Sequence, residues 1–135
     1  MIWCRVDHRL DFVGRRILIV DDEPYILRIL SFKLRRVGYT TFEAESAETA
    51  EKLLGEHEID LVLLDVALAT PTNGFDLAAK LRRNSRTQHL PIIMLTARGF
   101  ASDVLRGREI GAAGYITKPF AAEEVVRRVQ SFLES

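Results

Sequence analysis

Runs of consecutive apolar residues recur along the chain, and apolar positions at helical spacing fill the stretches between them. Residues 17–20, 61–64 and 92–95 are apolar at every position. Residues 39–44 and 115–117 are weaker strand candidates that contain Thr and aromatic residues. A strand that is apolar throughout is covered on both faces, which is typical of a parallel sheet. The pattern therefore predicts five short parallel strands.

Helical spacing predicts one helix after each strand. The first helix begins near Pro24, which fits a first helical turn, and ends before Gly38, which fits a helix terminus. The others are expected from about residue 46, over about residues 75–83 and 101–110, and from about residue 122. Few large apolar residues lie in 101–110, so we expect that helix to be the least stable. The side chains expected to face the core are Ile26, Leu30, Leu34, Val37, Ala47, Ala50, Leu53, Leu54, Leu77, Leu81, Val125 or Val126, Val129, Phe132 and Leu133.

Five alternating strands and helices predict a doubly wound α/β domain. Parallel strands joined by right-handed crossovers need helices on both faces of the sheet, which gives a (βα)5 three-layer sandwich. In such folds the reactive crevice lies at the carboxyl ends of the strands. The residues that follow each apolar run are therefore the candidates for chemistry.

Composition narrows the class of protein. A chain of 135 residues is one ordinary domain, and we assign residues 1–14 to an N-terminal extension and 15–135 to that domain. Nineteen basic residues balance nineteen acidic ones, which argues against nucleic acid or an anionic membrane as the main partner. The single cysteine, Cys4, excludes an internal disulfide, and no apolar run approaches the roughly 20 residues of a membrane span. We expect a cytoplasmic protein without direct nucleic acid or membrane contacts.

Three carboxylates stand at the ends of two predicted strands. Asp21 and Asp22 follow the first apolar run directly, and Asp65 follows the run at 61–64. If these strands are neighbours, the carboxylates share one crevice and repel each other unless a cation joins them. Oxygen ligands favour a hard ion such as Mg²⁺, and one Asp could instead be a nucleophile toward a phosphoryl group. The alternative for any one of them is a turn or a helix cap.

A hydroxyl and an ammonium group follow two further strands. Thr96 comes after the run at 92–95, and Lys118 comes after residues 115–117. Together at one edge they suit an anion, and phosphoryl transfer needs such groups to neutralise the phosphoryl oxygens. Taken alone, Thr96 could be a helix cap or a core hydroxyl, and Lys118 a solvated surface lysine.

These residues lie in segments that carry a resemblance to a known family. The segments read ILIVDDEP (17–24), LLD (63–65), MLTAR (94–98) and GYITKPF (114–120). In this order and spacing, from about residue 15 onward, the chain resembles the receiver domain of two-component response regulators, and its last half most resembles receivers of DNA-binding regulators. The resemblance implies a flavodoxin-like fold with strand order 2-1-3-4-5.

The resemblance also implies a role for each site residue. Asp65 is expected to be the phospho-accepting nucleophile. Asp22, directly, and Asp21, mostly through water, would bind Mg²⁺ with Asp65 and the backbone carbonyl of Ala67. Thr96 and Lys118 would bind the phosphoryl group. Tyr115 would be the aromatic switch that moves inward as Thr96 moves, and the Lys118–Pro119 bond is expected to be cis.

The sequence departs from the family after the nucleophile. The Pro and Gly that usually lie four and eight residues beyond it are displaced to Pro71 and Gly74. Residues 66–74 therefore carry one inserted residue, in the loop that is expected to face a kinase.

The expected partners are a sensor histidine kinase or phosphotransfer protein and a downstream effector. The surface that reads the switch would be the fourth helix, fifth strand and fifth helix, through which a homodimer is also expected; its charges are Asp103, Arg106, Arg108, Glu109, Glu124 and Arg128. The chain would catalyse only its own phosphorylation and dephosphorylation, so we expect no enzyme. The alternatives are a pseudo-receiver, a fragment of a DNA-binding regulator or hybrid kinase, and an aspartyl-phosphate hydrolase. Such hydrolases have a second Asp where this chain has Ala67.

Overall fold

The computed structural model describes residues 14–68, 73–96 and 108–134. Its strands are β1 (Arg16–Val20), β2 (Thr40–Ala44), β3 (Leu61–Asp65), β4 (Ile92–Thr96) and β5 (Gly114–Thr117). Its helices are α2 (Pro24–Arg36), α3 (Ala47–Glu56), α4 (Gly74–Arg82) and α6 (Ala122–Glu134). All strand pairs are parallel and the sheet order is β2-β1-β3-β4-β5, which confirms the predicted topology.

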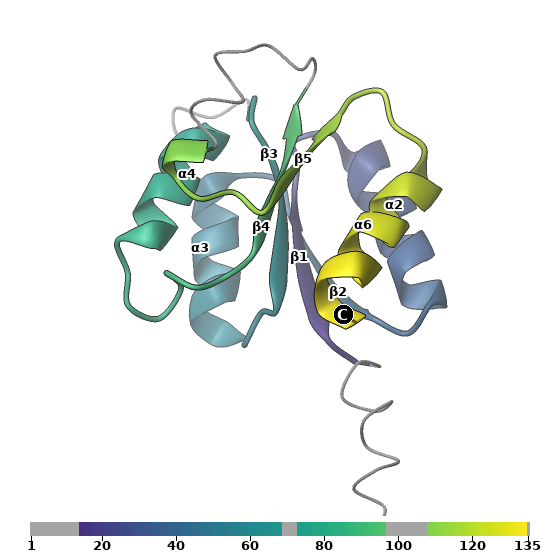
Figure 1. The fold of residues 1–135 in the computed structure, drawn as a ribbon, viewed down its shortest axis with the longest axis horizontal. Coiled ribbons are helices and arrows are strands. Elements are labelled where there is room, and N and C mark those ends of the chain that lie inside the picture. Colours follow the sequence, from purple (N-terminus) through teal and green to yellow (C-terminus); the bar gives the residue numbers. More distant parts are fainter. Residues whose placement is uncertain (1–13, 69–72, 97–107, 135) are drawn as a thin grey trace, which may run out of the picture.

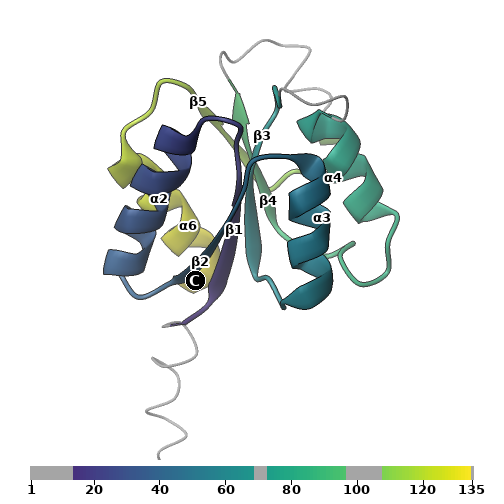
Figure 2. The same cartoon turned by 180° about the vertical axis from the view of Figure 1, so that it is seen from behind.

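The sheet lies between two helical layers (Figures 1 and 2). Helices α2 and α6 cover one face, and α3 and α4 cover the other. Successive residues of β1 alternate between the two sides: Ile17 and Ile19 pack under α2 and α6, whereas Leu18 and Val20 pack under α3 and α4. Two cores on one sheet explain why the central strands are apolar at every position.

Two of the predicted inward positions are wrong. Val37 is 36% exposed and Phe132 is 40% exposed. Val37 caps the end of α2, just before Gly38 turns the chain at a φ of 106°, so it no longer follows the helical stripe. Leu27 is buried in α2, while Ile26 is only partly buried, and Val125, Val129 and Leu133 form the inner stripe of α6.

A buried tyrosine lies at the end of the sheet where the strands begin. Tyr39 precedes β2 and is only 3% exposed. Its hydroxyl donates a hydrogen bond to the Glu134 Oε2 atom at 3.1 Å. Burial, followed by the hydrogen bond to Glu134 and the charge of Glu134, raises the pKa of Tyr39 well above its ordinary value. This contact joins the last turn of α6 to the sheet.

Two predictions fall largely outside the described residues. The N-terminal extension, residues 1–14, is described only at Gly14, and the expected helix at 101–110 only from residue 108 onward. Residues 108 and 109 are helical. Over the described ranges, no helix has both the length and the apolar character needed to cross a membrane.

Candidate functional site

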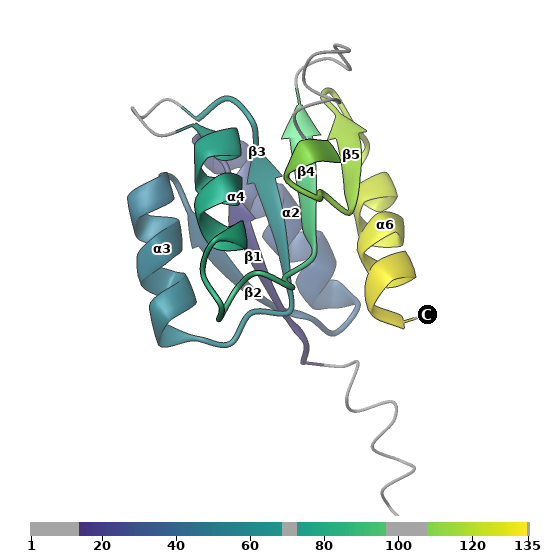
Figure 3. The ribbon, with the colours of Figure 1, turned by 60° about the vertical axis from the view of Figure 1, so that its left-hand side comes forward.

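The predicted site residues meet at the carboxyl ends of the strands. The arrowheads of β3, β4 and β5 point to the same end of the sheet (Figure 3). Asp21 directly follows β1, while Asp65 and Thr96 are the last residues of β3 and β4. Lys118 directly follows β5, and its amide donates to the carbonyl oxygen of Thr96 at 2.6 Å. The parallel topology therefore brings four separate sequence motifs to one edge.

Three carboxylates form the centre of this edge. One oxygen each of Asp21, Asp22 and Asp65 lies within 4.8 Å of the other two. Asp21 is fully buried and Asp65 is 4% exposed, while Asp22 is half-buried. Repulsion between carboxylates this close, with little water to screen them, favours a cation among them. Oxygen-only donors at this spacing fit a hard divalent ion.

Lys118 contacts the two buried carboxylates of the cluster. Its Nζ atom is 2.8 Å from Asp21 Oδ2 and 3.3 Å from Asp65 Oδ2, and its side chain is only 17% exposed. Burial disfavours the ammonium form, but the hydrogen bond to Asp21 and the charges of Asp65 and Asp21 outweigh it and raise the pKa of Lys118. Lys118 is therefore charged and held by both carboxylates.

Backbone amides orient the two buried carboxylates. Glu23 N–H donates to Asp21 Oδ1 at 2.9 Å, and Ala67 N–H donates to Asp65 Oδ1 at 3.1 Å. In each case the donor lies two residues beyond the carboxylate, so the turn that leaves the strand also fixes the side chain. Each carboxylate thus directs Oδ1 to its own turn and Oδ2 to Lys118.

The environment of Asp65 opposes its negative charge. Burial, followed by the charge of Asp21, raises the pKa of Asp65 to about 6, although Lys118 and the Ala67 amide partly compensate. One ammonium group does not offset three acidic groups. A further cation at the cluster would favour the ionised form of Asp65, which is the form that can act as a nucleophile.

The two predicted switch residues lie on the neighbouring strands. Thr96 is 2% exposed, and the next described strand, β5, carries Tyr115, which is half-buried against the core under α3 and α4. Burial raises the pKa of the Tyr115 phenol. The carbonyl oxygen of Tyr115 accepts a hydrogen bond from Arg128 Nη2 at 3.1 Å. Switching by Thr96 and Tyr115 stays a prediction, as do the roles of the other site residues.

The loop after Asp65 is closed by Gly74, the glycine that is displaced by one residue relative to the family pattern. Gly74 N–H donates to the Val66 carbonyl oxygen at 2.9 Å. A Cβ atom at Gly74 would overlap the carbonyl oxygen of Asp65. Position 74 therefore needs glycine because the first turn of α4 packs directly against the backbone of Asp65. The inserted residue inferred for 66–74 falls within a loop of which 69–72 lie outside the described residues.

The cis bond predicted at Lys118 is confirmed, whereas pairing across a dimer stays a prediction. The Lys118–Pro119 bond is cis, as expected. Of the charges predicted to pair across a dimer, Asp103 and Arg106 lie outside the described residues, and Arg128 binds a backbone carbonyl of its own chain.

Known proteins resemble this chain over most of its length. The family model that describes the response regulator receiver domain matches residues 17–130. The chain is 43% identical over 121 residues to the phosphate regulon transcriptional regulatory protein PhoB of Pseudomonas aeruginosa, covering 90% of this chain and 52% of PhoB. The chain thus spans about half the length of the curated relatives it matches.

Solved structures show the same fold. The non-phosphorylated HemR receiver domain of Leptospira biflexa matches with a TM-score of 0.82 and 35% identity, covering 90% of this chain and 96% of that one. The chemotaxis protein CheY4 of Vibrio cholerae matches with a TM-score of 0.82 and 27% identity, covering 87% and 98%. The match of the family model over residues 17–130 and these relatives show that the chain belongs to the family of response regulator receiver domains.

Proposed function

We propose that the chain is a phospho-accepting receiver of a two-component phosphorelay, with Asp65 as the acceptor. The observation that supports this most is the position of Asp65, which shares a buried edge with Asp21, Asp22 and Lys118. The carboxylate is nearly buried yet lies at the end of a strand, where a phosphorylated donor can reach it. We also propose that the chain is cytoplasmic and that it catalyses no reaction on other substrates.

In this proposal each charged residue of the site has a defined role in the transfer. An Asp65 carboxylate oxygen forms the bond to phosphorus as the bond from phosphorus to the donor nitrogen breaks, and that nitrogen keeps the electron pair and takes a proton from water. Asp21, Asp22, Asp65 and the Ala67 carbonyl would hold Mg²⁺. When bound, Mg²⁺ supplies charge neutralisation for the phosphoryl oxygens. Lys118, already beside Asp65, would pair with one phosphoryl oxygen, and the Thr96 hydroxyl would donate to another.

Phosphorylation would then change the surface on the β5 side of the molecule. It replaces one negative charge at Asp65 by about two and adds acceptor oxygens. Thr96 would shift toward the phosphoryl group, and Tyr115 would move into the space that is left. The effector would read residues 108–117 together with α6, and a homodimer through this surface would use the charges of Arg108, Glu109 and Glu124.

A donor protein also needs a surface beside the acceptor. Three of the large hydrophobic side chains that are exposed, Tyr25, Phe32 and Val37, lie on α2 or at its end. Helix α2 begins at Pro24, directly after the Asp21–Asp22 turn, and Tyr25 is 67% exposed in its first turn. In the proposal a histidine kinase or phosphotransfer protein packs against this face while its phosphohistidine reaches Asp65.

Mass spectrometry after incubation with phosphoramidate tests the proposal. With Mg²⁺ present, the wild-type chain should gain about 80 Da, the mass of one phosphoryl group, at Asp65. Asp65→Asn and wild type with a chelator should stay unmodified, while Asp60→Asn, at the opposite edge of the sheet, should be modified like wild type. An unmodified wild type that binds no Mg²⁺ would indicate a pseudo-receiver, and turnover of a phosphomonoester would indicate a hydrolase.

A further inference from the structure

Arg82, the last residue of α4, donates hydrogen bonds to backbone carbonyl oxygens of two chain segments. Its Nε, Nη1 and Nη2 atoms all donate to carbonyl oxygens, and these belong to the loop before β4 and the turn before β5. The bonds go to Ile110 (2.8 Å), Leu90 (2.8 Å), Gln88 (3.1 Å), Gly111 (3.1 Å) and Thr87 (3.5 Å).

The chemistry of this contact is specific to arginine. Among the described residues, no carboxylate forms an ion pair with Arg82. Burial lowers the pKa of Arg82, yet a guanidinium group stays protonated in proteins. Its planar fork presents five N–H donors at fixed angles, whereas the lysine ammonium presents three around a single atom. Lysine at this position would keep the charge but could not bridge both segments in the same way.

The segments that Arg82 binds lead into the two strands of the proposed switch. Leu90 precedes β4, which ends at Thr96, and Gly111 precedes β5, which carries Tyr115. Gly111 has a φ of 70° and its amide donates to the carbonyl oxygen of Arg108 at 3.0 Å, so the turn before β5 has a defined shape. The Ala113 amide donates to the Ile92 carbonyl oxygen at 2.7 Å and joins the two strand entrances directly.

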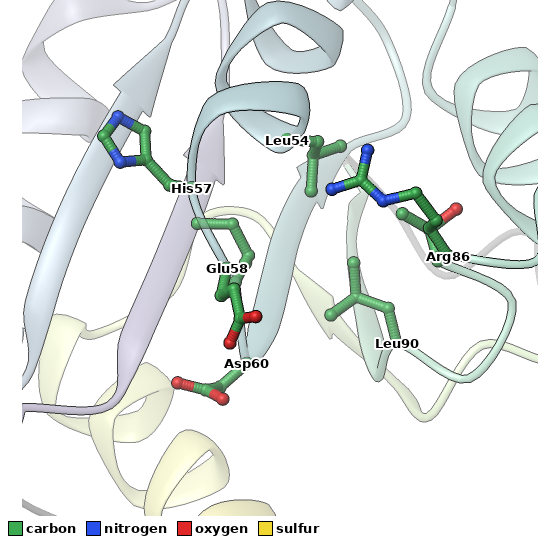
Figure 4. A pocket seen from close by; sticks show the side chains of 8 residues that line it. Leu54, His57, Glu58, Asp60, Arg86 and Leu90 are labelled. Carbon is green, nitrogen blue, oxygen red and sulfur yellow. The ribbon is translucent and has the colours of Figure 1, made fainter.

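Helix α4 connects this contact with the acceptor site. Its first residue, Gly74, packs against the backbone of Asp65, and its last residue is Arg82. The loop that Arg82 holds also forms one wall of a hollow of about 350 Å³, which is lined by Arg86 and Leu90 from this loop and by residues 57–60 from the segment before β3 (Figure 4). Arg82 thus lies where α4, the entrance to β4 and the entrance to β5 meet, at the edge of the sheet away from the acidic cluster.

We infer that Arg82 is a positioning residue for the switch: it fixes the amino-terminal entrances of β4 and β5, so that phosphorylation changes only their carboxyl ends. This inference rests on the proposed function. A switch needs one fixed end if a small shift at Thr96 is to move Tyr115 relative to the rest of the domain. Five carbonyl acceptors supply that fixed end without any carboxylate whose charge could respond to the site.

Amide hydrogen exchange with and without beryllofluoride, a phosphoryl mimic, tests the inference. In wild type with Mg²⁺, beryllofluoride should change exchange of the Lys118 amide by about tenfold or more, and of the Gly111 and Ala113 amides by less than about twofold. In Arg82→Lys, Gly111 and Ala113 should exchange about tenfold faster without the mimic and should become sensitive to it. Arg83→Lys, a change at the exposed neighbouring arginine, should behave as wild type.

The outcomes separate the inference from the proposed function. A wild type in which Gly111 and Ala113 respond as strongly as Lys118 refutes the inference, and this comparison needs no variant to fold. An Arg82→Lys protein that matches Arg83→Lys refutes it as well. If beryllofluoride leaves every amide of wild type unchanged, the proposed function fails and the inference fails with it.

Discussion

Two partly buried cations lie at opposite edges of the sheet, and their partners differ in kind. Lys118, at the carboxyl edge, is held by the carboxylates of Asp21 and Asp65. Arg82, at the amino edge, is held by five backbone carbonyls. A carboxylate can change its charge when it is protonated, modified or bound by a metal, whereas a peptide carbonyl cannot.

The difference indicates which edge responds and which stays fixed. One partner of Lys118, Asp65, is the group whose charge the proposed reaction alters, so the position of the Lys118 ammonium depends on the state of Asp65. The partners of Arg82 keep the same dipoles in every state of the site. At the carboxyl ends of the strands the charges therefore change with the state of Asp65, whereas at the amino ends the hydrogen bonds of Arg82 stay the same.

Removing the carboxyl-edge cation should have the largest effect. Lys118→Met keeps the length of the side chain but leaves the phosphoryl group without its ammonium partner. We expect phosphorylation of Asp65 by phosphoramidate to slow by about 10²- to 10³-fold, as for loss of one transition-state donor elsewhere. Time-resolved mass spectrometry would measure it. Lys80→Met, which removes an exposed ion pair with Glu51, is the control and should react at the wild-type rate. A Lys118→Met rate within a factor of two of wild type would contradict the role of Lys118.

A substitution at Gly74, where α4 packs against the acceptor strand β3, should have the next largest effect. Gly74→Ala places a methyl group against the Asp65 carbonyl, and we expect it to lower the free energy of unfolding by about 2 to 3 kcal/mol. Gly55→Ala is the matched control, because Gly55 lies inside α3 with open space around it and should stabilise by about 0.5 to 1 kcal/mol. Urea denaturation measures both. Equal stabilities for the two variants would show that α4 does not press on Asp65.

The smallest expected effect tests a second contact at the amino edge, between the Tyr39 hydroxyl and the Glu134 carboxylate. The raised pKa of Tyr39 means that the folded protein keeps the phenol proton while the unfolded chain loses it above a pH of about 10. This contribution to stability is therefore complete below that pH and is lost as the pH rises further.

Urea denaturation at two alkaline pH values measures this loss. Tyr39→Phe should lose about 1 kcal/mol less stability than wild type between pH 10 and 11. Tyr25→Phe, at a position that is 67% exposed, should follow the wild-type curve. Parallel curves for Tyr39→Phe and wild type would rule out the protonated phenol as a pH-dependent contact.

The acidic site could be predicted from the sequence because the residues at strand ends follow a simple rule. Residues that follow apolar runs in a parallel sheet gather at one edge, and this rule places Asp21, Asp65, Thr96 and Lys118 together. In the described helices, periodicity was reliable in the middle and was wrong at two positions near helix ends: Val37 leaves the helical path, and Phe132 lies on the outer side of α6.

The two contacts that organise α4 could not be predicted from the sequence. Arg82 binds carbonyl oxygens, which every residue carries, so no partner side chain marks the contact in the sequence. The need for glycine at position 74 depends on a close approach between α4 and β3, which only the folded backbone defines. The displaced glycine was the one available signal, and it indicated an irregular loop rather than a contact with Asp65.

The hydrogen bond from Gly74 to Val66 makes the loop after the acceptor a closed ring of chain whose two ends are fixed at the sheet and at α4. Additional residues inside such a ring cost little, since the closure entropy rises by only about 0.6 kcal/mol for each doubling of length. Added residues between Val66 and Gly74 should therefore change the free energy of unfolding little and, under the proposed function, leave the chemistry at Asp65 in place.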